Sequence, residues 1–254
     1  MDARTRCLQI LDILQQKHKV KVKDLAALFG TSEMTIRRDL NILTQQYNII
    51  RTHGGAKLIQ DSVVKTISFD ESKIENKEAK RLIAKKAATL IEHRQKIYID
   101  SGSTTRNMVH FFNKYMKNII VTNSITISEI AVQFENISVV LLGGEVLPIA
   151  KCTFGPTTEE QVLNHQFDAA FLGTAAIGSD GFLYDGYSLE GRLKVSVLDL
   201  AKKVYLLVDS SKFNEFDIHK FGSLNKIDTV ITDSGLKNEA KQLLNQYNVE
   251  IIYA

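Results

Sequence analysis

The sequence is poor in the residues that bind metals or form disulfides, because only two of its 254 residues are cysteines. Cys7 and Cys152 lie far apart, and this spacing fits neither a metal-ligand motif nor a disulfide framework. The six histidines show no paired spacing either. We therefore expect a protein without a metal site and without a cofactor.

Long apolar runs are missing as well. No stretch of about 18 consecutive apolar residues occurs, so we expect no transmembrane helix. The first residues, MDARTRCLQILDILQQ, carry charges among their apolar side chains and lack the unbroken apolar segment of a signal peptide. With 44% apolar and 24% charged residues, the composition is ordinary for a soluble globular protein. These features predict a cytoplasmic location.

Charge is present in ordinary amount but is unevenly distributed. Residues 1–60 hold ten Lys and Arg against five Asp and Glu, whereas the remainder holds 22 against 24. A basic segment on a slightly acidic body suggests that the segment meets a polyanion such as DNA. An excess of five positive charges does not establish DNA binding by itself. The pattern of helices and strands in this segment is needed as well.

The first 60 residues have the pattern of a small domain built on three helices. Apolar spacing predicts helices over 4–17, 23–29 and 33–46, with a β-favouring piece at 20–22. Two short strands around a Gly-Gly turn are predicted over 48–59. Helix, strand, helix, tight turn, helix and hairpin is the order of a winged helix-turn-helix domain.

Local signals set the ends of these helices. The second helix presents Leu25, Leu28 and Phe29, and Gly30 ends it because glycine readily takes the left-handed conformation. Ser32 then stands where the third helix needs an N-cap.

The third helix has one apolar and one polar face. Ile36, Leu40 and Leu43 are spaced to point inward. The outward positions are Met34, Thr35, Arg37, Arg38 and Asn41. Two adjacent arginines near a helix N-terminus can reach base edges and bond guanine, and the terminus itself favours phosphate. A solvated basic face on a structural helix is the alternative, which the preceding helices and the hairpin disfavour.

We extend the candidate DNA contacts to the turn before the third helix and to the hairpin beside it. The hairpin residues are placed to touch the DNA backbone next to the groove. The full set is Lys23, Thr31, Ser32, Met34, Thr35, Arg37, Arg38, Asn41, Arg51, His53 and Lys57.

The pattern changes after residue 60. Residues 60–73 lack a clear period and are predicted to be a linker between a DNA-binding domain, 1–59, and a larger domain, 74–254. A charged helix is predicted over 74–93. Apolar β-branched runs predict strands at 97–99, 119–121, 139–142, 169–172, 204–208, 230–231 and 249–252. Helical stretches lie at 104–114, 124–134, 157–165, 188–201 and 237–247. This alternation predicts an α/β domain with a largely parallel sheet.

Three of the predicted strands end in loops rich in glycine and hydroxyl groups. These loops cover 100–105, 122–124 and 143–144. Loops at the carboxyl ends of parallel strands meet in the usual ligand crevice of open α/β sheets, and such loops can turn N–H groups and hydroxyls toward a phosphate. Ordinary turn and cap residues are an equally good explanation. Nucleotide binding is disfavoured because the glycine motifs for dinucleotides and nucleotide triphosphates are absent from the sequence.

The sequence LAALFGTSEMTIRRDL at 25–40, followed by RTHGGA at 51–56, resembles the DNA-binding head of the DeoR family of bacterial repressors. The motif is long and specific, and the resemblance extends from about Arg4 to Ala254. It implies a helix-turn-helix over 20–39 with Thr35, Arg37 and Arg38 on the DNA-facing helix. It also implies a C-terminal sensor domain similar in fold to ribose-phosphate isomerases and glucosamine-phosphate deaminases.

The resemblance supplies further sensor positions, namely Gly155, Asp168, Gly173, Glu190, Lys194 and 209–213. The candidate effector-binding residues are Asp100, Ser101, Gly102, Ser103, Thr104, Thr105, Thr122, Asn123, Ser124, Gly143, Gly144, Gly173, Glu190, Lys194 and Lys212. Family members often have Arg at the positions of Ser72 and Val195, which puts some family contacts in doubt.

These observations predict a repressor of a sugar-metabolism operon that a phosphorylated sugar releases from its operator. A homo-oligomer, a dimer or a tetramer, would place two heads on two half-sites. The first alternative is a sugar-phosphate isomerase or deaminase with a DNA-binding head, for which Asp100, Glu190, Lys194 and Lys212 are candidates by residue type. Glu190 and Lys194 also fit an ordinary exposed pair one helical turn apart. The second alternative, an activator, is not excluded by the sequence.

Overall fold

The computed structural model divides the chain into two compact units, Met1–Lys65 and Thr66–Ala254. It describes residues 6, 9, 10, 13, 14, 17, 19–46, 49–52, 54–58, 76–148, 150–186 and 188–254. Within these ranges it leaves out the side chains at positions 41, 42, 44–46, 49–51, 58 and 188–190. The predicted linker, 60–73, and most of the predicted first helix lie outside the described residues.

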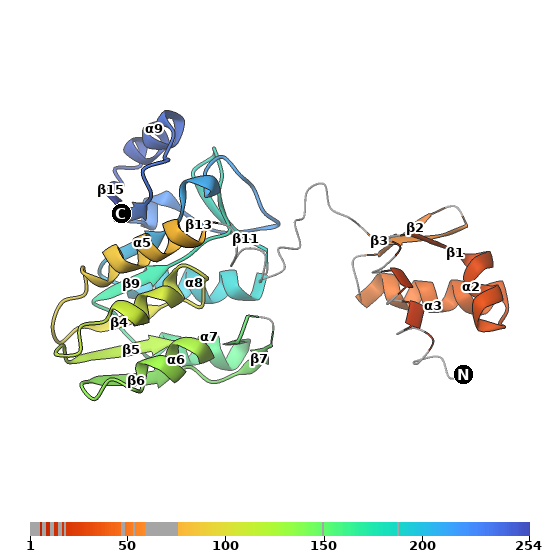
Figure 1. Cartoon of the computed structure of the whole chain (residues 1–254), viewed down its shortest axis with the longest axis horizontal. Coiled ribbons are helices and arrows are strands. Elements are labelled where there is room, and N and C mark those ends of the chain that lie inside the picture. The colour runs from red at the N-terminus through yellow and green to blue at the C-terminus, as the bar shows by residue number, and fades with distance from the viewer. Residues whose placement is uncertain are drawn as a thin grey trace. The chain divides into compact units, whose positions relative to one another are not determined.

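The N-terminal unit is a winged helix-turn-helix domain, as predicted (Figure 1). Its elements are β1 (Lys19–Lys21), α2 (Val22–Phe29), α3 (Glu33–Gln46), β2 (Ile49–Thr52) and β3 (Gly55–Leu58). The strands form an antiparallel sheet in the order β1-β3-β2. Gly55 has no room for a side chain, because a Cβ there would collide with the carbonyl oxygen of Val20.

An apolar cluster joins the elements of this unit. Its buried members are Ile10, Leu14, Val20, Val22, Leu25, Ile36, Leu40, Leu43 and Ala56. Two predictions need correction. The strand lies at 19–21 rather than 20–22, since Val22 already begins α2 and packs inward. Leu28 does not join Leu25 in the core, because it lies on the outer side of a helix only eight residues long and is 64% exposed.

The C-terminal unit is built on a seven-stranded parallel sheet, which confirms the predicted α/β class. All seven predicted strands are found, in the order β15-β14-β12-β9-β4-β5-β6. They are β4 (Lys96–Ile99), β5 (Asn118–Thr122), β6 (Ile137–Leu141), β9 (Ala169–Leu172), β12 (Val204–Leu207), β14 (Thr229–Thr232) and β15 (Glu250–Tyr253).

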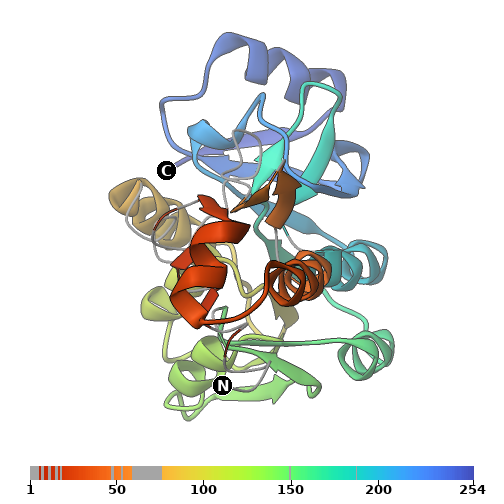
Figure 2. The same cartoon turned by 90° about the vertical axis from the view of Figure 1, so that its right-hand side faces the viewer.

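Helices cover both faces of this sheet, because successive residues of the central strands point to opposite faces and are apolar on both. Ile97 and Ile99 of β4 pack in one cluster with α5 (Lys77–Ala88), η1 (Thr105–Phe111) and α6 (Ile125–Ala131). Tyr98 faces the other cluster, with α7 (Pro156–Leu163), α8 (Ser188–Leu200) and α9 (Asn238–Gln246). Figure 2 shows α5 and α6 on the left of the sheet and α7 and α8 on its right.

The helices agree with the predicted positions, except that α5 and α6 are shorter and η1 is a 3-10 helix. An α-helix over 104–114 is therefore wrong. A hairpin and a small antiparallel sheet were not predicted from the sequence. They consist of β7 (Glu145–Leu147), β8 (Cys152–Phe154), β10 (Ala176–Ile177), β11 (Phe182–Asp185) and β13 (His219–Ser223). Two short 3-10 turns, η2 (Ser210–Lys212) and η3 (Leu224–Lys226), complete the elements.

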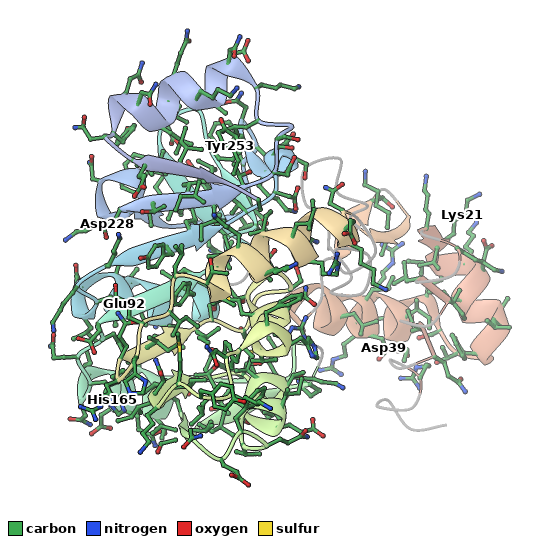
Figure 3. The ribbon with its side chains drawn as sticks, turned by 60° about the vertical axis from the view of Figure 1, so that its left-hand side comes forward. Lys21, Asp39, Glu92, His165, Asp228 and Tyr253 are labelled. Carbon is green, nitrogen blue, oxygen red and sulfur yellow. The ribbon has the colours of Figure 1, made fainter. Side chains whose placement is uncertain are left out.

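The strand order fixes where the chain reverses direction across the sheet. From β4 the chain proceeds to β5 and β6 on one side, and then to β9, β12, β14 and β15 on the other. The crevice of such a sheet opens between the carboxyl ends of the two strands at the reversal, here β4 and β9. Figure 3 labels Asp228, Glu92 and His165, which precede β14, β4 and β9 and mark the opposite, amino-end edge.

Candidate functional sites

The helix α3 is held at its start by Ser32, as predicted. The Ser32 hydroxyl accepts a hydrogen bond from the backbone N–H of Thr35 at 3.2 Å and lies 2.9 Å from the Thr35 hydroxyl. The preceding helix α2 ends at Gly30, whose φ of 61° is left-handed. This tight turn fixes the angle between α2 and α3 and leaves the first turn of α3 open to solvent.

The two faces of α3 are arranged as predicted. Ile36 and Leu40 are fully buried, whereas Met34, Arg37 and Arg38 are exposed. Met34 is 75% exposed, so it is available to a partner of this face. Thr35 and Thr31 are partly exposed, and the side chain of Asn41 lies outside the description.

The two arginines of α3 differ in their neighbours. Arg37 lies 3.5 Å from the carboxylate of Glu33 in an exposed pair one turn apart. Arg38 makes no hydrogen bond or ion pair within the part of the chain that the structure describes. Because an exposed pair contributes only about 0.3–0.5 kcal/mol, both guanidiniums can turn to another partner at little cost.

A buried ion pair, which was not predicted from the sequence, holds the inward-facing side of α3. Arg6 Nε donates to Asp39 Oδ2 at 2.6 Å and Arg6 Nη2 to Asp39 Oδ1 at 3.2 Å. Asp39 is only 2% exposed although it stands beside the exposed Arg38. A single Asp within a basic stretch gives no sequence signal that it points inward, since its partner lies 33 residues earlier.

The sheet of this unit carries further exposed lysines. Lys57, a predicted contact, faces Lys19 directly across the β1–β3 pair, and both are exposed. Like charges at directly opposed positions repel each other, so an anion next to them would be stabilising. Lys19 was not among the predicted contacts. Lys23 is exposed at the start of α2, whereas His53 and the side chain of Arg51 lie outside the described residues.

In the C-terminal unit, the loops after β4 and β9 meet at the reversal point of the sheet. Asp100 Oδ2 accepts a hydrogen bond from the backbone N–H of Gly173 at 3.1 Å. Gly102 lies over the same place, since a Cβ there would be 3.2 Å from Asp100 Oδ2 and 3.8 Å from the Gly173 Cα. A side chain would therefore be tight at Gly102, whereas a Cβ at Gly173 would make only ordinary contacts.

A buried lysine joins this loop pair to the small sheet. Lys194 of α8 is 5% exposed, and its ammonium donates to Asp185 Oδ2 at 2.8 Å and to the carbonyl of Gly173 at 2.9 Å. It also lies 3.3 Å from Asp100 Oδ2. The interpretation of Lys194 as part of an exposed pair with Glu190 is therefore wrong for the lysine, while the side chain of Glu190 lies outside the description.

In this cluster, burial disfavours the ionised form of Asp185. Burial raises the pKa of Asp185 above its ordinary value, although Lys194 and the N–H of Ala175 act to lower it. The Ala175 N–H donates to Asp185 Oδ1 at 3.0 Å. Each oxygen of Asp185 therefore already has a donor.

The loop after β4 has unused hydrogen-bond donors. We find no intramolecular hydrogen bond from the backbone N–H groups of Ser101, Gly102, Ser103 and Thr104 within the described part of the chain. The Thr105 hydroxyl, in contrast, donates to the carbonyls of Asp100 and Gly102 and closes the loop on itself. Consecutive free N–H groups in a loop form a concave site for an anion, even though η1 is too irregular to supply a helix dipole.

The polar groups of the loops after β5 and β6 form hydrogen bonds with neighbouring elements of the fold. The Thr122 hydroxyl donates to the carbonyl of Ile99, and Ser124 caps α6. Asn123 accepts from the Tyr98 hydroxyl and donates to the Thr153 carbonyl. These three predicted residues therefore have structural partners.

Gly143 and Gly144 are also taken up by the fold. The N–H of Gly143 donates to Gln161, and its carbonyl accepts from Thr158. Gly144 has a φ of 141° and no room for a side chain beside Thr158. Both glycines therefore serve the junction with α7.

Two other predicted positions, Gly155 and Asp168, lie away from the reversal point of the sheet. Gly155 precedes α7 with a φ of 96°. Asp168 lies at the amino end of β9, where it accepts from the Lys96 N–H and pairs with Lys202. Asp168 is thus separated from the reversal point by the length of the strand.

Lys212 follows β12, and its backbone N–H donates to the carbonyl of Asp209 at 3.1 Å. The residue is partly buried, and its ammonium makes no hydrogen bond or ion pair within the described residues. In the same loop, Asp209 is 2% exposed and accepts from Asn76 and from the backbone and hydroxyl groups of Ser211. Since β12 neighbours β9, this loop belongs to the same edge of the sheet as the reversal point.

Two family models match the chain. A DeoR-like helix-turn-helix domain matches residues 6–62, and a DeoR C terminal sensor domain matches residues 75–234. Among characterised relatives, the glycerol-3-phosphate regulon repressor of Escherichia coli (strain K12) is 31% identical over 95% of each chain. The HTH-type transcriptional repressor GlcR of Bacillus subtilis (strain 168) is 30% identical over 97% of this chain and 95% of its own.

Solved structures also match part of the chain. Ribose 5-phosphate isomerase A from Methanocaldococcus jannaschii is 22% identical, covers 55% of each chain and has a TM-score of 0.41. The structure of eIF2B beta from Chaetomium thermophilum is 13% identical, covers 70% of this chain and 56% of its own, and has a TM-score of 0.46.

Proposed function

The chain belongs to the DeoR family of transcriptional regulators, and we propose that it represses a sugar-metabolism operon until a phosphorylated sugar releases it from DNA. The observation that carries this proposal is α3, a capped helix with a buried apolar face and two exposed arginines at its outer face. The named relatives that match over almost the whole chain are repressors as well.

We assign DNA contacts of two kinds. Thr35, Arg37 and Arg38 are placed on α3 to meet base edges in the major groove. Lys23, Lys57 and the newly found Lys19 are placed to meet phosphates, which fix the position of the head without distinguishing sequences. The repulsion between the opposed Lys19 and Lys57 would be relieved by a phosphate between them.

The effector site is proposed at the reversal point of the large sheet. The free N–H groups of 101–104, with the hydroxyls of Ser103 and Thr104, suit a phosphate, and Lys212 supplies a free positive charge at the same edge. We remove the loops 122–124 and 143–144 from the effector contacts, because their polar groups already have partners.

The repressor is proposed to work in the cytoplasm as a dimer or tetramer. Two heads would then meet half-sites about 34–36 Å apart, or a multiple of that. The effector must bind the DNA-competent and the released arrangement with different affinity, since a ligand with equal affinity for both cannot shift the equilibrium.

The proposal is tested by two linked measurements on the full-length protein. Selection from random duplexes should yield one enriched sequence with two related halves. Glucose 6-phosphate, fructose 6-phosphate, ribose 5-phosphate and glycerol 3-phosphate are then titrated into the complex. We expect at least one to release the DNA and to raise the melting temperature of the free protein. Stable DNA binding without response to any phosphorylated sugar would refute the effector class but leave the repressor intact.

Removing the hydroxyls of Ser103 and Thr104 in the effector loop should uncouple sensing from DNA binding. In the variant Ser103→Ala with Thr104→Ala, operator affinity should stay as in the parent, because neither residue lies in the DNA-binding unit. The effector concentration that releases half of the DNA should rise by about tenfold, as expected for two lost hydrogen bonds. Titration of the operator complex with the releasing sugar phosphate measures this, and an unchanged midpoint would place the phosphate elsewhere.

We propose that the chain has no catalytic activity. Asp100 and Lys194 do converge, as an isomerase would require. However, Lys194 already contacts two carboxylates and a carbonyl, so a proton transfer through its ammonium would break a buried network. Sustained interconversion of any of the four sugar phosphates by the purified protein, followed by chromatography, would contradict this proposal.

A further inference from the structure

We infer that Asn76 is a positioning residue for the effector response, because its amide joins the start of α5 to the loop that carries Lys212. Through this contact, a change that the effector makes in the loop reaches the chain segment that leads to the DNA-binding unit. The inference rests on the proposed function and deepens it, since it assigns a route by which the sensor acts. Asn76 is suited to this place because it is the first described residue of the C-terminal unit, shortly after the predicted linker.

The side chain of Asn76 joins two segments that are far apart in the sequence. Its amide nitrogen donates to Asp209 Oδ1 at 2.9 Å and to Ser211 Oγ at 3.2 Å, and these partners come 133 and 135 residues later. We call these two hydrogen bonds the Asn76 link. The backbone of Asn76 has a φ of 55°, in the left-handed region that asparagine tolerates better than most residues. The link thus occupies both hydrogens of the amide.

Asn76 does not cap its own helix. An asparagine at the start of a helix usually accepts a hydrogen bond from an N–H of the first turn. Asn76 makes no such bond, whereas Ser124 caps α6 in this way. The side chain at the start of α5 therefore serves the loop after β12 rather than the helix.

The carboxylate that receives the Asn76 link is bonded unevenly. Asp209 is buried, and its Oδ1 accepts from Asn76 and from both the N–H and the hydroxyl of Ser211. Its Oδ2 is also buried and makes no hydrogen bond within the described residues. A buried carboxylate oxygen without a donor is costly. The present arrangement of the loop therefore depends on the donors at Oδ1, and Asn76 is the one that comes from outside the loop.

The lysine proposed to meet the phosphate belongs to the same short turn. Lys212 closes η2 by donating its backbone N–H to the carbonyl of Asp209 at 3.1 Å. Its ammonium has no partner within the described residues. A phosphate held by the free N–H groups of 101–104 attracts this ammonium, and the attraction acts on the turn that Asp209 begins.

The other contacts of this turn hold it to rigid parts of the unit. The N–H and hydroxyl of Ser210 donate to Asp233 after β14, at 2.7 and 2.8 Å. Phe213 is buried in the apolar cluster of the large sheet. A force on η2 between these two fixed points is therefore relieved at the remaining contact, which is the Asn76 link.

Hydrogen exchange tests the link in the full-length protein without any ligand. Asn76→Gly permits the left-handed φ but lacks the amide, and Asn76→Asp keeps the shape but cannot donate to Asp209. Both variants should speed backbone exchange at 209–213 by about tenfold. Ser211→Ala should in return speed exchange in the first turn of α5. A negative charge favours a helix start and glycine does not, so a shared effect does not come from helix stability.

Asn136→Gly is the matched control for these variants. Its amide also joins distant segments, by donating to the Lys114 carbonyl at 3.1 Å, but it lies before β6 at the opposite edge of the sheet. Exchange at 209–213 and in the first turn of α5 should stay as in the parent. Unchanged exchange at 209–213 in both Asn76 variants would overturn the inference.

The coupling between sensing and DNA binding is measured as a ratio. The probe is whichever of glucose 6-phosphate, fructose 6-phosphate, ribose 5-phosphate and glycerol 3-phosphate releases the parent. The operator Kd with saturating probe, divided by the Kd without it, is the coupling factor. In both Asn76 variants this factor should fall by about fivefold or more. The operator Kd without probe, and the probe Kd of the free protein, should stay within about threefold of the parent.

The outcomes separate the Asn76 link from the function beneath it. If the variants weaken both affinities but keep the coupling factor, Asn76 only stabilises the fold, and the inference is wrong. If none of the four sugar phosphates releases the parent, the proposed effector class fails, whereas hydrogen exchange still decides whether Asn76 holds the loop after β12.

Discussion

Replacing Asp39 by alanine is expected to destabilise the N-terminal unit by about 3–5 kcal/mol, because it leaves the charge of Arg6 buried without its carboxylate. A small domain has a stability of only about 5–15 kcal/mol, so this loss would remove a substantial part of the stability of the unit. Urea unfolding followed by circular dichroism should show an early transition for this unit. Operator binding should fall in parallel, although Asp39 itself points away from the DNA-facing side.

Glu33→Ala is the matched control for Asp39→Ala. It removes the other ion pair of the same helix, between Glu33 and Arg37, which is exposed. Its expected cost is below about 0.5 kcal/mol. Similar unfolding midpoints for the two variants would mean that the Arg6–Asp39 pair does not hold α3 in place.

The second large effect is expected in the C-terminal unit. Lys194→Met keeps the length of the side chain but leaves Asp100 and Asp185 buried without their shared cation. The loss of one partner from a buried ionic network costs about 3–5 kcal/mol. Differential scanning calorimetry should show a lower melting temperature for this unit. Lys202→Met, at a lysine 76% exposed in its pair with Asp168, should change it by less than the equivalent of about 0.5 kcal/mol.

The loss of folding stability caused by Lys194→Met should grow as the pH rises. Burial already raises the pKa of Asp185, and Lys194 opposes that effect. Without the lysine the pKa of Asp185 rises further. A carboxyl whose folded-state pKa is raised contributes stability that is lost as the pH rises through that pKa. The variant should therefore be closest to the parent at about pH 5 and furthest from it at about pH 8, and a deficit that grows toward low pH would contradict this explanation.

Much of the fold follows from local patterns. The alternation of β-branched runs and helical stretches predicted all seven strands of the large sheet, because a strand buried on both faces is apolar throughout. Ser32 and Gly30 marked the boundary between α2 and α3, because capping depends on residues only a few positions apart. The inward and outward faces of α3 followed from helical spacing alone.

The errors share a physical cause. Lys194 lies buried between residues 9 and 94 positions earlier in the chain, and no local pattern distinguishes it from a solvated lysine on a helix. The same holds for Asp39, whose partner is Arg6. Leu28 was named with Leu25 and Phe29 as an apolar residue of the second helix, but it is 64% exposed because that helix is too short to bury its outer side. Partners distant in sequence decide such positions, and only the folded chain brings them together.

The same limit applies to the sensor loops. Three loops rich in glycine and hydroxyl groups were equivalent in the sequence. In the structure, those after β5 and β6 use their polar groups to hold neighbouring elements, as Asn123 and Gly143 do. The loop after β4 keeps its N–H groups free. This difference in hydrogen bonding is the reason for proposing the loop after β4 as the effector site.

The central claim is that the outer face of α3 contacts bases, and selection from random duplexes tests it most directly when parent, Arg37→Ala and Arg38→Ala are compared. We predict that each variant loses about 1–3 kcal/mol of affinity for the parent's sequence and that preference relaxes at one or two base positions in each half-site. Lys57→Ala should instead weaken all sequences alike, as expected for a phosphate contact. Unchanged base preferences and affinity in both arginine variants would contradict the placement of α3 in the groove.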